Sequence, residues 1–114
     1  EGNAAAAVSA NVQPGPPSSA PGRPGFDCAR AHSAGEIAVC SDSGLAALDL
    51  NMTTEYRRAL TTASPAQTRL LQTTRDRFLA YRDGCPNRAC IANAYLGRMR
   101  EIRDIMEGRL APSR

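Results

Sequence analysis

The sequence predicts a small all-α protein: an antiparallel bundle of three main helices and a short N-terminal helix, with two disulfides and a disordered N-terminal tail. Three observations lead to this prediction. Apolar residues recur at steps of three and four over most of the second half of the chain, without a strand-like alternation. Helix-start residues precede each of these periodic stretches. The four cysteines form an even set, as expected for disulfides in a small domain.

The N-terminal segment, residues 1–25, is rich in Pro, Ala, Gly and Ser and contains almost no large apolar side chains. Such a segment buries too little surface to offset the entropy lost on ordering, so it is predicted to be a flexible tail. Ordering on a partner is the alternative interpretation. Residues 26–110 are predicted to form one disulfide-stapled helical domain, and residues 111–114 a flexible C-terminus.

The first predicted helix covers about residues 34–40. Ser33 and Glu36 have the Ser-x-x-Glu spacing of a capping box, in which two side chains satisfy backbone N–H groups at the helix start. A second helix is predicted over about residues 44–63, with Asp42 as its N-cap. Its apolar face is formed by Leu45, Leu48, Met52, Tyr56, Ala59 and Leu60, while Asp49, Glu55, Arg57 and Arg58 are expected mainly off this face.

A third helix is predicted from Ser64 to about Arg82. Ser64 caps it, Pro65 takes its first position, and Gln67 completes a second capping box. Its expected inner face consists of Leu71, Thr74, Phe78 and Tyr81. The short connection before this helix predicts antiparallel packing on the second.

Asn87 is the predicted cap of a fourth helix over about residues 88–107, and Gly108 is its C-cap. Ile91, Tyr95, Met99, Ile102 and Met106 form the expected inner face. The charged residues of this helix are expected to form a solvated face with pairs such as Arg100–Asp104 and Arg103–Glu107. That face comprises Arg98, Arg100, Glu101, Arg103, Asp104 and Glu107.

The cysteines stand at positions 28, 40, 85 and 90, which allows three pairings. The local pairing, Cys28–Cys40 and Cys85–Cys90, is favoured because each pair brackets a short segment that begins or ends a predicted helix. Closing the first loop stabilises the fold by roughly 3 kcal/mol in the chain-entropy model. Two structural disulfides indicate an oxidising compartment, so a periplasmic or secreted protein is expected.

Metal and cofactor sites are not predicted. Zinc sites favour closely spaced cysteine pairs, whereas the cysteines here are separated by eleven and four residues and the single histidine, His32, stands alone. The C-x-x-C spacing of redox catalysts is also absent. His32 is expected to be a surface residue, and Asp27, Asp42 and Glu36 to be capping or turn residues. An enzyme is therefore not predicted.

The net charge is +3, and every basic residue is an arginine. Acids are interleaved with the arginines, a pattern that argues against nucleic-acid binding. No apolar run approaches the ~20 residues of a membrane span. The chain starts at Glu1, which is interpreted as a mature form with its signal peptide removed. A monomer is expected.

Several motifs together resemble the LprI-type lysozyme-inhibitor family, a bacterial domain formerly of unknown function. The resemblance covers about residues 26–110 and is most specific up to Asp49. Phe78 stands where the family usually has Trp, Thr53 where Asn is frequent, and Ser43 where Pro is common. The matching residues are Phe26-Asp27-Cys28, Glu36, Cys40, Ser41-Asp42, Leu45-Ala46-Ala47-Leu48-Asp49, Tyr56, Phe78 to Cys85, Cys90, Tyr95, Arg98 and Arg103.

The resemblance implies a cell-envelope protein that binds and inhibits lysozyme. Lysozymes cleave glycans with two carboxylates in a cleft, so cationic groups on rigid turns are reasonable contacts. The candidate partner-binding residues are Arg30, Arg82, Asp83 and Arg88, which lie near the two predicted disulfides. Two alternatives stay open: Arg82 and Asp83 form only a helix-end ion pair, or the protein is a structural or adaptor module that binds another envelope protein through a helical face.

Overall fold

The computed structural model describes residues 23–109, which contain four α-helices and one 3-10 turn. No strand occurs within that range, so the all-α prediction is confirmed. The predicted tail falls almost entirely outside the described residues, as do residues 111–114. The elements are η2 (Cys28–Arg30), α1 (Ala34–Cys40), α2 (Ser43–Thr62), α3 (Pro65–Asp83) and α4 (Arg88–Met106).

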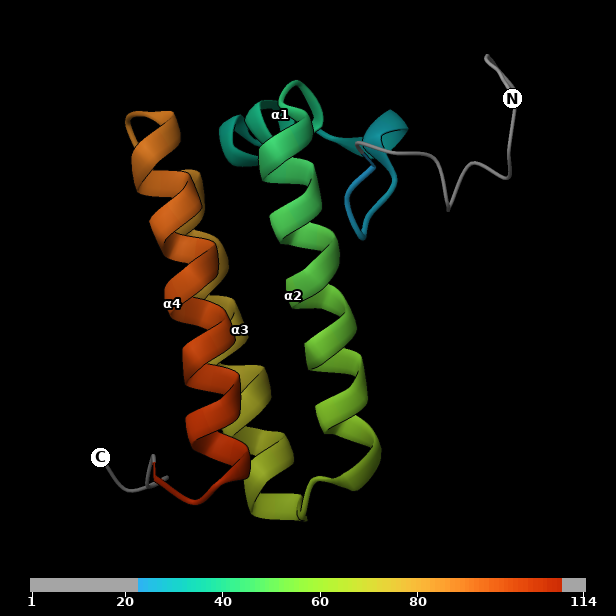
Figure 1. Cartoon of the computed structure of the whole chain (residues 1–114), viewed down its shortest axis with the longest axis vertical. Coiled ribbons are helices and arrows are strands. Elements are labelled where there is room, and N and C mark those ends of the chain that lie inside the picture. Colours follow the sequence, from blue (N-terminus) through green and yellow to red (C-terminus); the bar gives the residue numbers. More distant parts are fainter. Residues whose placement is uncertain (1–22, 110–114) are drawn as a thin grey trace.

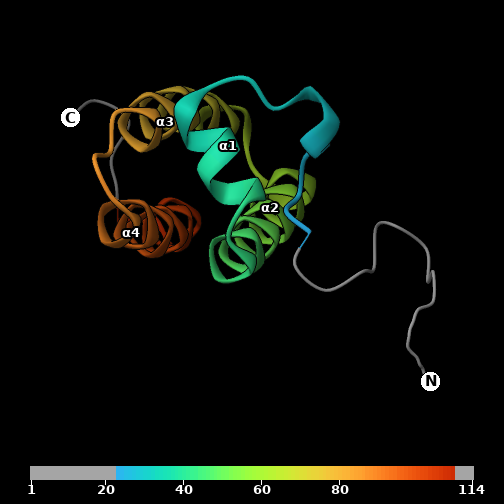
Figure 2. The ribbon, with the colours of Figure 1, turned by 90° about the horizontal axis from the view of Figure 1, so that it is seen from above.

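The three long helices run alternately up and down the bundle (Figure 1). Helix α4 packs along both α2 and α3, whereas α2 and α3 contact each other much less. Helix α1 crosses one end of the bundle and lies between α2 and α3 when it is seen from above (Figure 2). None of the described helices has the length and apolar character required to cross a membrane.

The predicted helix starts are confirmed. Ser33 Oγ accepts a hydrogen bond from the Glu36 N–H at 3.1 Å, and Glu36 Oε1 accepts one from the Ser33 N–H at 3.2 Å. Ser64 and Gln67 form the same reciprocal pair at the start of α3. Helix α4 ends in a Schellman motif. Gly108 follows its C-cap with a φ of 77°, and the Arg109 N–H donates to the Asp104 carbonyl.

The core is formed by the inner faces of the helices, and the Phe78 and Tyr95 rings meet edge to face with centroids 5.2 Å apart. The prediction was wrong for Tyr81, whose residue surface is 62 % exposed. Arg82 takes the inward position at that level of α3, which continues the spacing from Phe78. The buried apolar residues are Val39, Leu45, Ala46, Met52, Ala59, Leu71, Phe78, Ile91, Ala94, Tyr95, Met99, Ile102 and Ile105.

The predicted solvated face of α4 was wrong for Arg98, which is only 2 % exposed. Its guanidinium donates to Thr74 Oγ1 at 2.7 Å, to the Leu71 carbonyl at 3.0 Å and to Glu101 at 2.9 Å. Burial lowers the pKa of Arg98, although Glu101 partly offsets this effect. The outer ion pairs also differ from those expected, because the observed ones include Arg103–Glu55 and Arg109–Asp104.

Removal of the α3 cap tests the helix-start assignment. Ser64→Ala is expected to lower the free energy of unfolding by about 1 kcal/mol, because the Gln67 N–H loses its acceptor. Ser43→Ala is the matched control, since Ser43 is an exposed residue at the first position of α2. Urea unfolding with the disulfides intact measures both. Equal stability of the two variants would contradict the capping role.

Candidate functional site at the disulfide end

Both disulfides lie at the same end of the bundle. Cys28–Cys40 joins η2 to the end of α1, and Cys85–Cys90 closes the turn between α3 and α4. The local pairing predicted from the sequence is therefore confirmed. We call the surface formed by η2, α1, residues 41–42 and residues 84–87 the disulfide end; α1 and the α3–α4 turn lie at the upper end of Figure 1.

A buried polar network of Asp49, Arg82 and Tyr95 lies beneath this surface and joins the three long helices. The Tyr95 hydroxyl donates to Asp49 Oδ2 at 2.6 Å and accepts from Arg82 Nη1 at 3.1 Å. Arg82 Nη1 is also 3.9 Å from Asp49 Oδ2. Burial and the neighbouring Asp49 carboxylate raise the pKa of Tyr95, so the hydroxyl keeps its proton for this hydrogen bond.

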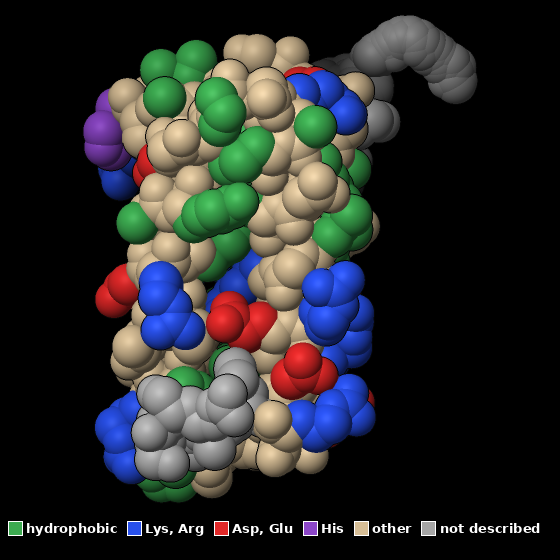
Figure 3. Space-filling model, turned by 90° about the vertical axis from the view of Figure 1, so that its left-hand side faces the viewer, with side chains coloured by type: hydrophobic (Ala, Val, Ile, Leu, Met, Phe, Trp, Pro, Cys, Tyr) green, Lys and Arg blue, Asp and Glu red, His purple; other side chains and the backbone are tan. Residues whose placement is uncertain are grey.

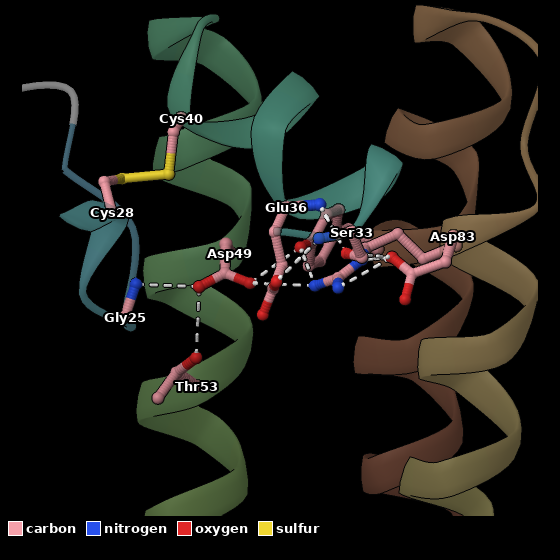
Figure 4. Close-up of polar contacts among 10 residues, drawn as sticks. Gly25, Cys28, Ser33, Glu36, Cys40, Asp49, Thr53 and Asp83 are labelled. Atoms are coloured by element: carbon pink, nitrogen blue, oxygen red, sulfur yellow. Dashed lines mark hydrogen bonds and ion pairs between the residues drawn. A yellow bond between two sulfur atoms is a disulfide. The ribbon is translucent and has the colours of Figure 1, made fainter. Parts of the chain in front are cut away.

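Arg82 also supports α1 through its neighbour Asp83. Its Nε and Nη2 donate to Asp83 Oδ1 at 3.1 and 2.9 Å, and Ser33 Oγ donates to the same oxygen at 3.0 Å (Figure 4). Gly35 sits directly against this pair, because a Cβ there would overlap Asp83 Oδ1. Burial lowers the pKa of Arg82, but its hydrogen bonds to Tyr95 and Asp83 outweigh burial and leave the pKa above its ordinary value.

The N-terminal segment of the described chain is held by Asp49. The Gly25 N–H donates to Asp49 Oδ1 at 2.7 Å, and Thr53 Oγ1 donates to it at 3.4 Å (Figure 4). The Arg82 guanidinium carbon is 6.0 Å from the centre of the Phe26 ring, within the range of a cation–π contact. These contacts, together with the Cys28–Cys40 bridge, fix the segment against α2 and α3.

The α3–α4 turn is tied to the start of α2 by an exposed ion pair. Arg88 Nε donates to Asp42 Oδ2 at 2.6 Å, and the same carboxylate caps α2 by accepting from the Gly44 and Leu45 N–H groups. The Arg88 hydrogen bond and the Leu45 N–H lower the pKa of Asp42. The turn and the second helix therefore present one continuous surface.

The structure separates the four predicted partner-binding residues. Arg82 is buried and forms an ion pair with Asp83, which also accepts a hydrogen bond from Ser33. The side chain of Arg88 is 60 % exposed but paired with Asp42. Arg30 is exposed at the end of η2, and the ion pairs found among residues 23–109 do not include it.

Sequence reasoning missed three supports of this end: the burial of Asp49, the Tyr95 hydroxyl contacts and the Ser33–Asp83 hydrogen bond. Asp49 stands four residues after Leu45 and three before Met52, so its place on the apolar stripe was a usable signal of burial. The other two contacts join residues 46 and 50 positions apart in the chain, for which the sequence carries no local signal.

The carboxylates at and beneath the disulfide end already have partners within the protein. Asp49 and Asp83 accept side-chain hydrogen bonds, Asp42 caps a helix, and Glu36 completes a capping box. His32 is a surface residue as predicted, with a side chain that is 88 % exposed. Within residues 23–109, no three His, Cys, Asp or Glu side chains are grouped as metal ligands.

Comparison of the chain with family models, curated proteins and solved structures finds no match.

Loss of the Tyr95 hydroxyl tests the buried network. Tyr95→Phe is expected to lower the free energy of unfolding by about 1–3 kcal/mol, because Asp49 Oδ2 and Arg82 Nη1 each lose a buried partner. Tyr81→Phe is the matched control, since Tyr81 is 62 % exposed, and it should stay close to the wild type. Chemical unfolding of both variants decides the matter. If the Tyr95→Phe protein were as stable as the control, the hydrogen bonds of Tyr95 would not stabilise the fold.

The capping role of the Glu36 carboxylate leads us to expect that the free energy of unfolding depends on pH. The His32 and Ser33 N–H groups hold the pKa of Glu36 below its ordinary value of 4.5. Its stabilising contribution is therefore complete above about pH 4.5 and disappears as the pH falls through the lower, folded-state pKa. Glu36→Gln should lose less unfolding free energy than the wild type between pH 5 and about pH 3. Parallel pH profiles of the two proteins in urea unfolding would disprove this assignment.

Proposed function

We propose that this protein is a non-catalytic cell-envelope protein that binds and inhibits lysozyme, with the disulfide end as the contact surface. One observation carries the proposal. Eleven of the residues that resemble the LprI-type family come from separate parts of the chain but gather at or directly beneath this end. They are the four cysteines, Phe26, Glu36, Asp42, Asp49, Arg82, Asp83 and Tyr95.

The geometry supports a binding role in physical terms. A surface held by two disulfides and a buried network loses little conformational entropy when it binds. Arg30 offers a guanidinium to an acidic cleft. Arg88, the first residue of α4, offers a second guanidinium, although the Asp42 carboxylate offsets its charge. Arg82 and Asp83 act in this proposal as positioning residues, because they hold α1 from below. The two disulfides are consistent with an oxidising compartment such as the periplasm or the extracellular space.

A second candidate, the adaptor, is favoured by a different face. On the side formed by α4 and α3, apolar side chains gather over the half near the disulfide end and charged ones over the other half (Figure 3). Tyr81 of α3 and Leu96 of α4 are among the exposed large apolar residues, at 62 and 48 %. Exposed apolar groups of this kind are typical of protein contacts. In this alternative the protein binds another envelope protein through the helical face, without inhibiting lysozyme.

Lysozyme lysis assays titrated with the oxidised protein test the main proposal, with chicken-type and goose-type enzymes. Stoichiometric inhibition is expected, and Arg30→Gln should weaken it at least about fivefold, the effect of losing a contact worth ~1 kcal/mol. Asp42→Asn should strengthen inhibition, because Asn still caps α2 while Arg88 loses its counter-charge.

Arg69→Gln is the control, since Arg69 is an exposed residue in the first turns of α3, at the opposite end of the bundle. Absence of inhibition by a folded, oxidised sample would reject the lysozyme proposal and leave the adaptor. In that case Tyr81→Ala and Leu96→Ala should abolish capture of the envelope partner. If Arg30→Gln and Arg69→Gln weakened inhibition equally, the disulfide end would be rejected as the contact surface.

A further inference from the structure

A groove between α2 and α3 has no role in the functions proposed above. At one end of the bundle α1 lies between the two helices, and at the other the two-residue connection Ala63–Ser64 joins them (Figures 1 and 2). Because α4 packs on both helices while they barely contact each other, a cavity of about 410 Å³ remains between them. That volume falls in the range of small-molecule sites, about 300–1,000 Å³.

The floor of this groove is apolar and fixed. Met52, Tyr56 and Leu60 follow one another at steps of four on α2, and Leu79 faces them from α3. The Tyr56 ring is held by two guanidinium groups, with the Arg98 and Arg75 carbons at 5.5 and 5.9 Å from its centre. A ring placed in this way is an ordered wall for an apolar ligand.

The charges along the groove are separated. Its two exposed arginines, Arg57 on α2 and Arg75 on α3, take part in none of the ion pairs found within residues 23–109. The carboxylates that line it, Glu36, Asp49 and Asp83, gather at the α1 end. Each of these accepts N–H or O–H donors from the protein itself. The arginines are therefore the groups left to recognise an anion.

The register of the helices sets the orientation of a ligand. Arg82 lies at the level of Asp49, and Arg75 at the level of Tyr56. These levels are seven residues apart, or about 10 Å along a helix. An anionic head beside Arg57 and Arg75 would thus leave an apolar body lying over Met52 and Leu79 toward the Phe26 ring. Since the groove is closed at both ends, it fits a short molecule better than a continuous polypeptide.

We propose that this groove binds a small amphipathic carboxylate of the medium-chain fatty-acid type, with its head between Arg57 and Arg75 and its chain over Met52 and Leu79. Charge complementarity selects the head, and the apolar floor selects the chain. This activity is distinct from lysozyme inhibition, because the arginines that hold the head and the apolar residues that hold the chain are not residues of the disulfide end.

Titration of the full, oxidised chain with octanoate tests the proposal by calorimetry and by NMR of side-chain methyl groups. Saturable one-to-one binding is expected, with shifts at the Met52 and Leu79 methyls. The double variant Arg57→Gln, Arg75→Gln should weaken binding at least about tenfold, a change of ~1.4 kcal/mol. Arg69→Gln, Arg100→Gln is the matched control, because it removes two exposed charges that do not line the groove. Urea unfolding verifies that both double variants are folded.

Three outcomes would overturn the proposal. In the first, octanoate produces no shifts at Met52 and Leu79 up to its micelle concentration. In the second, octanol binds as tightly as octanoate and the Arg57/Arg75 variant changes nothing, which would reduce the groove to an apolar hollow. In the third, lysozyme shifts these methyls while octanoate does not, which would assign the groove to a protein segment.

Discussion

The hydrogen bonds that Tyr95 makes to Asp49 and Arg82 are the interactions on which the rest of the structure depends. They join α4, α2 and α3 at one level, close to the end where α1 lies between α2 and α3. A buried carboxylate and a buried guanidinium are costly unless each is paired, so the three side chains stabilise one relative placement of the helices. Both α1 and the N-terminal segment are then attached to members of this network, through Asp83 and through Asp49.

A second buried arginine repeats this principle farther along the bundle. Arg98 reaches from α4 to Thr74 and to the Leu71 carbonyl on α3, while its guanidinium lies over the Tyr56 ring of α2. The domain is small and has no tryptophan, so the apolar core available to it is thin. Two arginines with fixed partners therefore define the relative positions of helices whose apolar stripes of Leu, Ile, Met and Ala alone would permit several.

Local interactions explain why much of the fold could be predicted from the sequence. The Ser33–Glu36 and Ser64–Gln67 caps act within four residues, and each disulfide closes a short loop between neighbouring elements. The burial of Asp49, Arg82 and Arg98 depends instead on partners on other helices, which stand 13 to 46 residues away in the chain. Tyr81 was assigned to the core for the same reason: helical periodicity allowed either it or Arg82 to face inward, and only the position of Tyr95 on another helix decides between them.

The candidate surfaces could be predicted less well, because they depend on what the helices leave uncovered. Arg30 and Arg88 were found from their closeness to cysteines, but the neutralising contact of Arg88 with Asp42 spans 46 residues. The groove had no sequence signal, since Met52, Tyr56, Leu60 and Leu79 have the spacing of ordinary core residues. They line a cavity at the end where α1 lies between α2 and α3, and Gly25 and Phe26 complete its wall. The segment of residues 25–31 also carries Arg30, and Phe26 both contacts Arg82 and lines the groove, so the two surfaces share one support. The segment that the Cys28–Cys40 bridge holds in place is therefore a common boundary of both surfaces.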